Sequence, residues 1–145
     1  MAETLGMLCD KLTIVKLKQY HTDDKDRLVS LQKQSVELQA EIDEYLYDAI
    51  QGNIPVEKMT FDANKVFKKE GNTVEDVTGS FGEVIYILAD VNCCLWHEQE
   101  KVYEFEKVPV QEKDKVIKKL ALLNLERNKC IDRINSLFAG MILKK

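Results

Sequence analysis

Two heptad repeats are the feature of this sequence that most limits its fold. Mostly apolar residues recur at alternating intervals of three and four, which places them on one face of a helix. In the first repeat the positions are Leu28, Leu31, Ser35, Leu38, Ile42, Tyr45 and Ala49. In the second repeat they are Ile117, Leu120, Asn124, Arg127, Ile131, Ile134 and Phe138. Such seams predict long helices that pack against other helices.

Capping and helix-breaking residues divide the chain into four long helices. Ser80 and Glu83 form a capping box at the start of the third helix, and Val108-Pro109 separates the third from the fourth. The expected helices span residues 4–21, 24–52, 80–106 and 109 to near the C-terminus. With roughly 18 to 28 residues each, they predict an all-α fold, an antiparallel four-helix bundle.

An irregular connection, about residues 52–80, joins the second and third helices. Gly71 and Gly79 punctuate it, and we expect a short helix at 62–69 and a turn after Thr73. Connections of this length are typical of lids, binding loops, oligomer contacts or mobile segments. The sequence leaves these alternatives open.

The composition fits a single helical domain covering residues 1–145. Hydrophobic residues make up 45% of the chain and charged residues 32%, which argues against disorder. A net charge of −4 argues against extended nucleic-acid binding, although a small anionic ligand needs only a local cationic cluster. We see no signal region and no membrane span, so we expect a cytoplasmic protein with no membrane partner. The four cysteines have no C-x-x-C spacing and are expected to be free thiols.

Polar residues interrupt the apolar faces of the third and fourth helices. Asn92 and Gln99 lie in the stripe of the third helix, and Asn124 and Arg127 lie in the seam of the fourth. A buried amide without hydrogen bonds costs roughly 1–3 kcal/mol, so these side chains need partners from the fold or from a ligand. In a hairpin about Pro109, Asn92 and Asn124 are expected at the same level.

The candidate site combines an aromatic ring, amides and positive charge. Trp96 offers a flat surface one turn from Asn92, while Arg127 and Lys11 supply cations, as a nucleotide-like or sugar-phosphate ligand requires. The expected ligand-binding residues are Asp10, Lys11, Asn92, Trp96, Glu100, Asn124, Arg127 and Asn128. We expect them to hold a small anionic, nucleotide-like ligand between the helices.

A buried polar layer is the alternative for the same residues. In that arrangement Asn92, Asn124 and Arg127 bond one another and pair with Asp10 or Glu100, and they fix the register of the helices. The sequence contains no Gly-rich phosphate loop, no recognisable Ser–His–Asp arrangement and no zinc spacing. No catalytic residue, metal ligand or cofactor is therefore expected.

Three segments carry motifs that can be compared with a known family. Residues 6–18 read G-x-x-x-D-K-L-T-I-V-x-x-K, residues 91–100 read V-N-x-x-L-W-x-x-Q-E, and N-x-x-R and I-N follow at 124–127 and 134–135. These resemble the D-K-L-[ST]-I-L, V-N-x-x-L-W-x-x-E-D and N-x-x-R motifs of an uncharacterised family of small all-helical proteins, a domain of unknown function. The resemblance omits residues 22–80 and implies a helical fold with a polar cluster. Gln99 replaces a family carboxylate, which weakens the case for two-carboxylate chemistry.

The expected function is non-enzymatic binding. A single domain of this size would store, buffer or sequester its ligand, for example as a viral sponge for a nucleotide messenger. One alternative is a metal-dependent hydrolase of a phosphorylated or nucleotide-linked sugar, using Glu100 and Asp10. Another is a structural or assembly helix bundle without a ligand. The long seam of the second helix favours a homo-oligomer, a dimer or higher.

Overall fold

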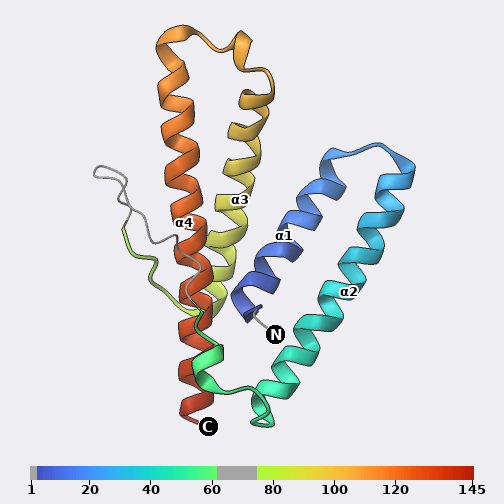
Figure 1. Cartoon of the computed structure of the whole chain (residues 1–145), viewed down its shortest axis with the longest axis vertical. Coiled ribbons are helices and arrows are strands. Elements are labelled where there is room, and N and C mark those ends of the chain that lie inside the picture. Colours follow the sequence, from blue (N-terminus) through green and yellow to red (C-terminus); the bar gives the residue numbers. More distant parts are fainter. Residues whose placement is uncertain (1–2, 62–74) are drawn as a thin grey trace.

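The computed structural model describes residues 3–61 and 75–145 (Figure 1). Over these residues the chain forms helices and no strand, which confirms the all-α class. The elements are α1 (Leu5–His21), α2 (Lys25–Ile50), the 3-10 turn η1 (Val56–Lys58), α3 (Phe81–Tyr103), the 3-10 turn η2 (Phe105–Lys107) and α4 (Val110–Leu143). The short helix expected at 62–69 and the turn expected after Thr73 lie outside the described residues. None of the described helices has the length and apolarity needed to cross a membrane.

Three of the four long helices begin at capping residues, at the positions where the sequence predicts their starts. The side chain of Thr4 accepts a hydrogen bond at the start of α1, Asp24 does so at the start of α2, and Ser80 does so at the start of α3. One expectation is wrong: α4 is longer than the others, with 34 residues. It continues through Gly140, because a helix-compatible glycine inside a well-packed helix lowers stability without ending it.

Two antiparallel hairpins form a V (Figure 1). The α1–α2 hairpin and the α3–α4 hairpin meet near the start of α1 and diverge toward its end. Helix α1 packs against α2, α3 and α4. Helix α2 reaches α4 near its own C-terminal end, where the ring centroids of Tyr45 and Phe138 lie 6.2 Å apart. The four-helix bundle is therefore closed at one end and open at the other.

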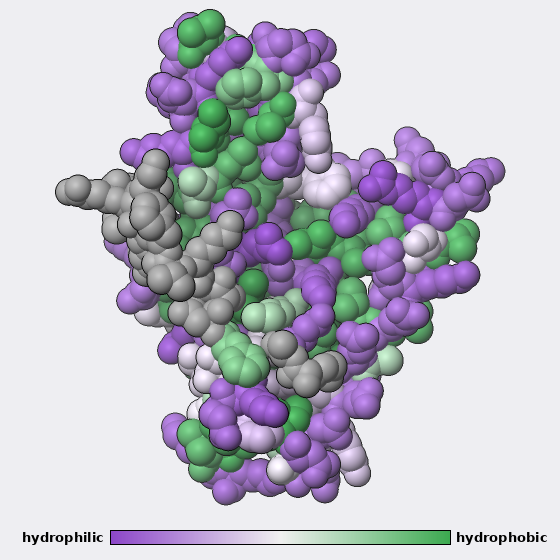
Figure 2. All heavy atoms as spheres, in the orientation of Figure 1, coloured by the Kyte–Doolittle hydropathy of each residue, from purple (hydrophilic) through white to green (hydrophobic). Residues whose placement is uncertain are grey.

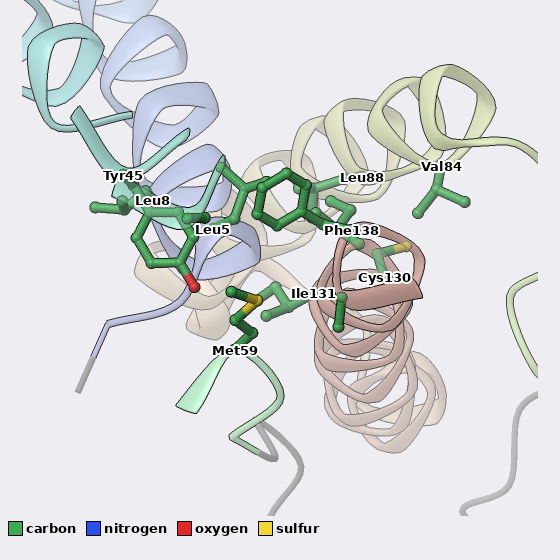
Figure 3. Close-up of a cluster of buried hydrophobic side chains, with 12 residues drawn as sticks. Leu5, Leu8, Tyr45, Met59, Val84, Leu88, Cys130, Ile131 and Phe138 are labelled. Atoms are coloured by element: carbon green, nitrogen blue, oxygen red, sulfur yellow. The ribbon is translucent and has the colours of Figure 1, made fainter. Parts of the chain in front are cut away.

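The hydrophobic core fills the closed end (Figure 3). Its buried members are Leu5, Leu8, Tyr45, Ala49, Met59, Val84, Leu88, Cys130, Ile131, Ile134, Phe138 and Ala139. They come from all four helices and from Met59, which follows η1. Burying a large apolar side chain contributes about 1.5–3 kcal/mol to the free energy of folding. Burial of this cluster is therefore the main interaction that holds the two hairpins together.

Gly6 allows α1 to approach α4 very closely. A Cβ atom on Gly6 would lie 2.5 Å from the carbonyl oxygen of Ile131 and 2.9 Å from Oδ1 of Asn135. The backbone N–H of Gly6 donates to Asn135 Oδ1 at 2.8 Å, which satisfies one of the N–H groups that the first turn of a helix leaves unpaired. The start of α1 is thus seated directly on the backbone of α4.

The expected seam of α4 is right in the core and wrong toward the open end. Ile131, Ile134 and Phe138 are buried as expected, whereas Ile117 is 55% exposed and Val116 is buried in its place. A straight helix drifts by about 20° per heptad from an exact seven-residue repeat. Over the three heptads from Phe138 to Ile117 this drift reaches about 60°, which brings Val116 closer than Ile117 to the packed face.

The expected stripe of α3 needs a similar correction. Asn92 is buried as expected, but Gln99 is exposed, and Glu98 takes the buried position beside α4. Beyond the point where α1 diverges, α3 packs mainly on α4, so the buried row follows Val84, Val91 and Glu98 at seven-residue intervals.

Candidate functional site

A buried polar cluster joins α1, α3 and α4. The Oδ1 atom of Asp10 accepts hydrogen bonds from Arg127 Nε at 2.9 Å and from Asn92 Nδ2 at 3.0 Å, and Oδ2 accepts from Arg127 Nη2 at 2.6 Å. Asn92 Nδ2 also donates to Thr13 Oγ1 at 2.8 Å. The Thr13 hydroxyl in turn donates to the backbone carbonyl of Asp10 at 2.7 Å. Asp10 and Asn92 are each only 3% exposed.

The fold itself satisfies this cluster. Both carboxylate oxygens of Asp10 have donors, and the Asn92 amide bonds two acceptors. A bidentate pair between arginine and carboxylate fixes geometry as well as energy. The cluster therefore sets the place where α1 crosses α3 and α4, which corresponds to the register-fixing alternative for Asp10, Asn92 and Arg127.

The other expected site residues do not join this cluster. Lys11 is exposed toward α2 and pairs with Glu3 at 2.5 Å. Glu100 is exposed and lies 3.9 Å from His97. Asn124 is exposed and Asn128 is only half-buried, so the opposite wall expected from α4 is not built. The drift of the α4 seam explains this, because it turns Asn124 away from the packed face.

A pocket lies next to the cluster, between α1 and α3. Its volume is about 550 Å³, within the usual range for small-molecule sites. The lining residues are Thr13, Lys16, Leu17, Tyr20, His21, Ala89, Cys93 and His97. Thr13 belongs to both the cluster and the pocket. The place where α1 crosses α3 and α4 therefore lies directly beside the pocket. Figure 2 shows hydrophobic residues in the opening between the two hairpins, whereas the outer surfaces are mostly hydrophilic.

Aromatic rings stand at the rim of this pocket. The rings of His21 and Trp96 stack with centroids 4.7 Å apart and planes 23° apart. Tyr20 and His97 meet His21 edge to face at 5.2 and 6.4 Å. His21 Nδ1 lies 2.8 Å from the carbonyl oxygen of Leu17, so in the neutral ring Nδ1 carries the proton and Nε2 is the acceptor. Trp96, expected to stack on a ligand, stacks on His21.

The sequence reasoning did not select Thr13, Lys16 or His21 as site residues. They lie on the part of α1 that leaves the core. Thr13 holds the [ST] position of the first motif, whereas Lys16 and His21 hold no motif position. The only sequence signal that these residues share is their spacing. Residues 13, 16, 17, 20 and 21 follow helical spacing and therefore share one face of α1. That signal gains meaning only when the opposite helix is known.

Glu98 is a second buried carboxylate, and it joins the two helices of the α3–α4 hairpin. It lies 3.0 Å from Lys101 Nζ and 3.1 Å from Lys119 Nζ, which confirms that α3 and α4 are antiparallel neighbours. Burial alone would raise the pKa of Glu98, but hydrogen bonds and positive charge from the two lysines outweigh it and hold the pKa below its ordinary value. Within the described residues no group of three or more His, Cys, Asp and Glu side chains gathers to hold a metal ion.

The cysteines are free thiols, as expected. Burial raises the pKa of Cys130 to about 11, and burial together with the charge of Asp10 raises the pKa of Cys9 to about 11. Cys93 is exposed and lines the pocket between α1 and α3. Cys93 is therefore positioned to report on the pocket.

No protein-family model, curated protein or solved structure matches this chain. The resemblance to an uncharacterised helical family stays a prediction.

Proposed function

We propose that this protein binds, without transforming it, a small anionic ligand with a flat, nucleotide-like ring, in the pocket between α1 and α3. The observation that carries the proposal is the lining of that pocket. It combines aromatic and cationic side chains with the apolar side chains of Leu17 and Ala89, and such sites bind flat ligands that bear a charge.

Each part of the ligand has a partner in the lining. The ring would lie against Tyr20 and His21, and the His21 ring is supported from behind by Trp96. The anionic group would pair with Lys16, whose ammonium is the permanent cation of this lining. Leu17 and Ala89 would cover the apolar edge of the ring.

The buried cluster supports binding by holding the pocket in shape. The pair between Asp10 and Arg127 fixes α1 against α4, and the Asn92 amide fixes it against α3. A site whose walls are already in place loses less conformational entropy on binding. In this proposal Arg127 positions the site and does not touch the ligand, in contrast to the sequence expectation.

The hydrolase alternative has less support than binding. It needs Asp10 and Glu100 at one point, but Asp10 is bonded to Arg127 and Asn92. Glu100 is not among the residues that line the pocket and lies 3.9 Å from His97.

A structural or assembly role is the second candidate. Helix α2 exposes Val29, Val36, Tyr47 and Ile50, with exposed fractions between 47% and 63%. A self-complementary contact of such residues would produce the homo-oligomer that the sequence favours. Light scattering coupled to size exclusion measures this state directly, and a monomer at high concentration contradicts the assembly role.

Titration with a ligand panel tests the binding proposal. The panel contains adenosine monophosphate, a cyclic dinucleotide, a sugar nucleotide and inorganic phosphate. Trp96 is the only tryptophan of the chain, so its fluorescence reports on the His21 stack. We expect a saturable change with a ring-bearing anion, stabilisation by about 2.7 kcal/mol at a hundredfold excess over Kd, and unchanged ligand by mass analysis.

Two lysines of α1 give a matched pair of variants for this titration. Lys16→Met should weaken binding at least tenfold, whereas Lys18→Met should not, because Lys18 lines a different surface, beside α2. Equal effects of the two substitutions, or no response to any member of the panel, would overturn the proposal. Detection of a chemically changed product would show that the protein is an enzyme and would contradict non-enzymatic binding.

A further inference from the structure

A second heptad stripe runs along the outer side of α2. Its members are spaced alternately by four and three residues, as in a coiled-coil seam. All of them are exposed, and those that are apolar are Val29, Val36, Ala40, Tyr47 and Ile50. At about 3.6 residues per turn, the stripe lies on nearly the opposite side of α2 from Leu31 and Tyr45, which are buried in the bundle. Helix α2 therefore has one packing surface toward the bundle and another on its outside.

The outer stripe of α2 is uncovered in the described part of the chain. Figure 1 shows α2 at the edge of the molecule, next to α1. The stripe extends from Val29 to Ile50, roughly 30 Å along the helix, and its large apolar side chains are at least 47% exposed. Apolar side chains that keep seam spacing over three heptads are typical of a surface that packs against another helix.

Lys33 and Asp43 complete the stripe and make it self-complementary. Two antiparallel copies of α2, related by a twofold axis at the level of Leu38, bring residues of the stripe together in pairs. Symmetry forms each pair twice, and the pairs are Val29 with Tyr47, Lys33 with Asp43, and Val36 with Ala40. Among the described residues, neither Lys33 nor Asp43 has an ion-pair partner in its own chain. Each charge is therefore available to a second copy.

The same two charges disfavour the other ways of pairing the stripe. In a parallel pair of helices Lys33 would face Lys33 of the second copy, and Asp43 would face Asp43, so both contacts would be repulsive. An antiparallel pair shifted by one heptad would place Lys33 opposite Val36 or Ile50 and would lose both ion pairs. The charges therefore select one orientation and one register.

We propose that two copies of this chain form a symmetric dimer through antiparallel α2 helices, in the register that pairs Lys33 with Asp43 of the second copy. Near the axis the small side chain of Ala40 lies opposite Val36, which lets the two helices approach closely. Glu37, at one edge of the stripe, would approach its own copy, but it lines a groove toward α1 together with Lys11 and Lys18, whose charges offset its own.

This dimer deepens the assembly role given above as the second candidate function, and it rests on that role. It does not rest on ligand binding, because no residue of α2 lines the α1–α3 pocket. Binding and dimerisation can therefore fail separately.

Sedimentation equilibrium of the full chain tests the dimer and its register. Lys33→Glu and Asp43→Lys should each weaken self-association at least tenfold, because each places like charges opposite one another at two points. An equal mixture of these two variants should form a heterodimer as tight as the wild-type dimer, since both contacts are then between opposite charges. Arg27→Glu and Glu41→Lys are the matched controls. They make the same changes of charge at exposed positions of α2 outside the stripe, and they should leave the dimer unchanged.

Each outcome of these measurements decides between the alternatives. A monomeric wild type at millimolar concentration overturns both the dimer and the assembly role. A dimer that Lys33→Glu weakens no more than Arg27→Glu, or a mixture of Lys33→Glu and Asp43→Lys that stays monomeric, overturns the proposed register. Circular dichroism should show unchanged helical content in all four variants, because the substituted side chains are exposed. Lys33→Glu should also leave the Trp96 fluorescence titration unchanged, so that loss of the dimer is distinguished from loss of binding.

Discussion

The carboxylate of Asp10 accepts a bidentate pair of hydrogen bonds from Arg127, at 2.9 and 2.6 Å, across the junction of the two hairpins. The Asp10 side chain is 4% exposed and that of Arg127 is 32% exposed. Because the two residues belong to α1 and α4, the pair exists only when the hairpins are docked. The free energy that couples Asp10 to Arg127 therefore measures how strongly the two hairpins hold each other.

Asp10→Asn should lower the free energy of unfolding by about 2 kcal/mol. The substitution leaves the Arg127 guanidinium partly buried without a counter-charge, and the exposure of Arg127 keeps the effect below the 3–5 kcal/mol typical of a fully buried pair. Urea unfolding followed by circular dichroism measures it. When Asp10→Asn is combined with Arg127→Met, the loss should be smaller than the sum of the two single losses. Additive losses would show that the pair does not couple the hairpins.

Gly6→Ala should destabilise the protein, by about 1–3 kcal/mol, although alanine is the better helix former. The new Cβ would lie 2.5 Å from the Ile131 carbonyl oxygen, so α1 must move away from α4. Gly140→Ala is the matched control, because nothing lies within 4 Å of its Cβ position. It should stabilise α4 by about 0.5–1 kcal/mol. Thermal unfolding of both variants gives the comparison, and a change of equal sign in both would contradict the close approach.

Glu98→Gln should lower the free energy of unfolding by about 1 kcal/mol at pH 7, since it removes charge-assisted hydrogen bonds to two half-exposed lysines. The folded protein holds the pKa of Glu98 below its ordinary value of 4.5. The charge of Glu98 therefore stabilises the fold above about pH 4.5, and this stability is lost as the pH falls through the lowered pKa.

The difference between wild type and Glu98→Gln should accordingly close as the pH falls below 4.5. Urea unfolding at pH 7 and at pH 3 measures it. Glu104→Gln is the control, because Glu104 pairs with Lys107 at an exposed site and its loss should be below about 0.5 kcal/mol. A difference that stays constant with pH would place the Glu98 effect in packing and not in charge.

A thiol reagent at pH 8 should modify Cys93 first and leave Cys9 and Cys130 almost untouched. With a pKa of about 11, Cys9 and Cys130 hold only about one thiolate in a thousand at this pH, and both are also shielded. Peptide mass analysis over time gives the order. A ligand of the α1–α3 pocket should slow the reaction of Cys93. Equally fast modification of Cys130 in the folded protein would show that the core opens readily.

The positions of the helices could be predicted from the sequence because their signals are local. Thr4, Asp24 and Ser80 are capping residues that act within one turn, and the core ends of the heptad repeats place Ile131 and Phe138 correctly. The far ends of the repeats failed at Ile117 because a small drift per heptad accumulates with distance.

The candidate site depended on contacts between distant segments. The sequence indicated that Asn92 and Arg127 interrupt apolar faces and offered Asp10 or Glu100 as their partner, but it could not decide between the two carboxylates; the structure has Asp10 bonding both. The α1–α3 pocket depends on the angle at which α1 leaves the bundle, and no local pattern encodes that angle. The hydrogen bond from the Gly6 N–H to Asn135 could not be predicted either, because it depends on the close approach of α1 to α4.

The contact of Gly6 on Ile131 also makes α1 a lever with its fulcrum at one end. From Gly6 to His21 the helix extends roughly 22 Å, at 1.5 Å per residue. A tilt of about 5° at the fulcrum would move the His21 ring by roughly 2 Å while the core beneath stays in place. The end of the α1–α3 pocket at His21 would therefore shift about twice as far as its wall at Thr13, which lies roughly halfway between the fulcrum and His21.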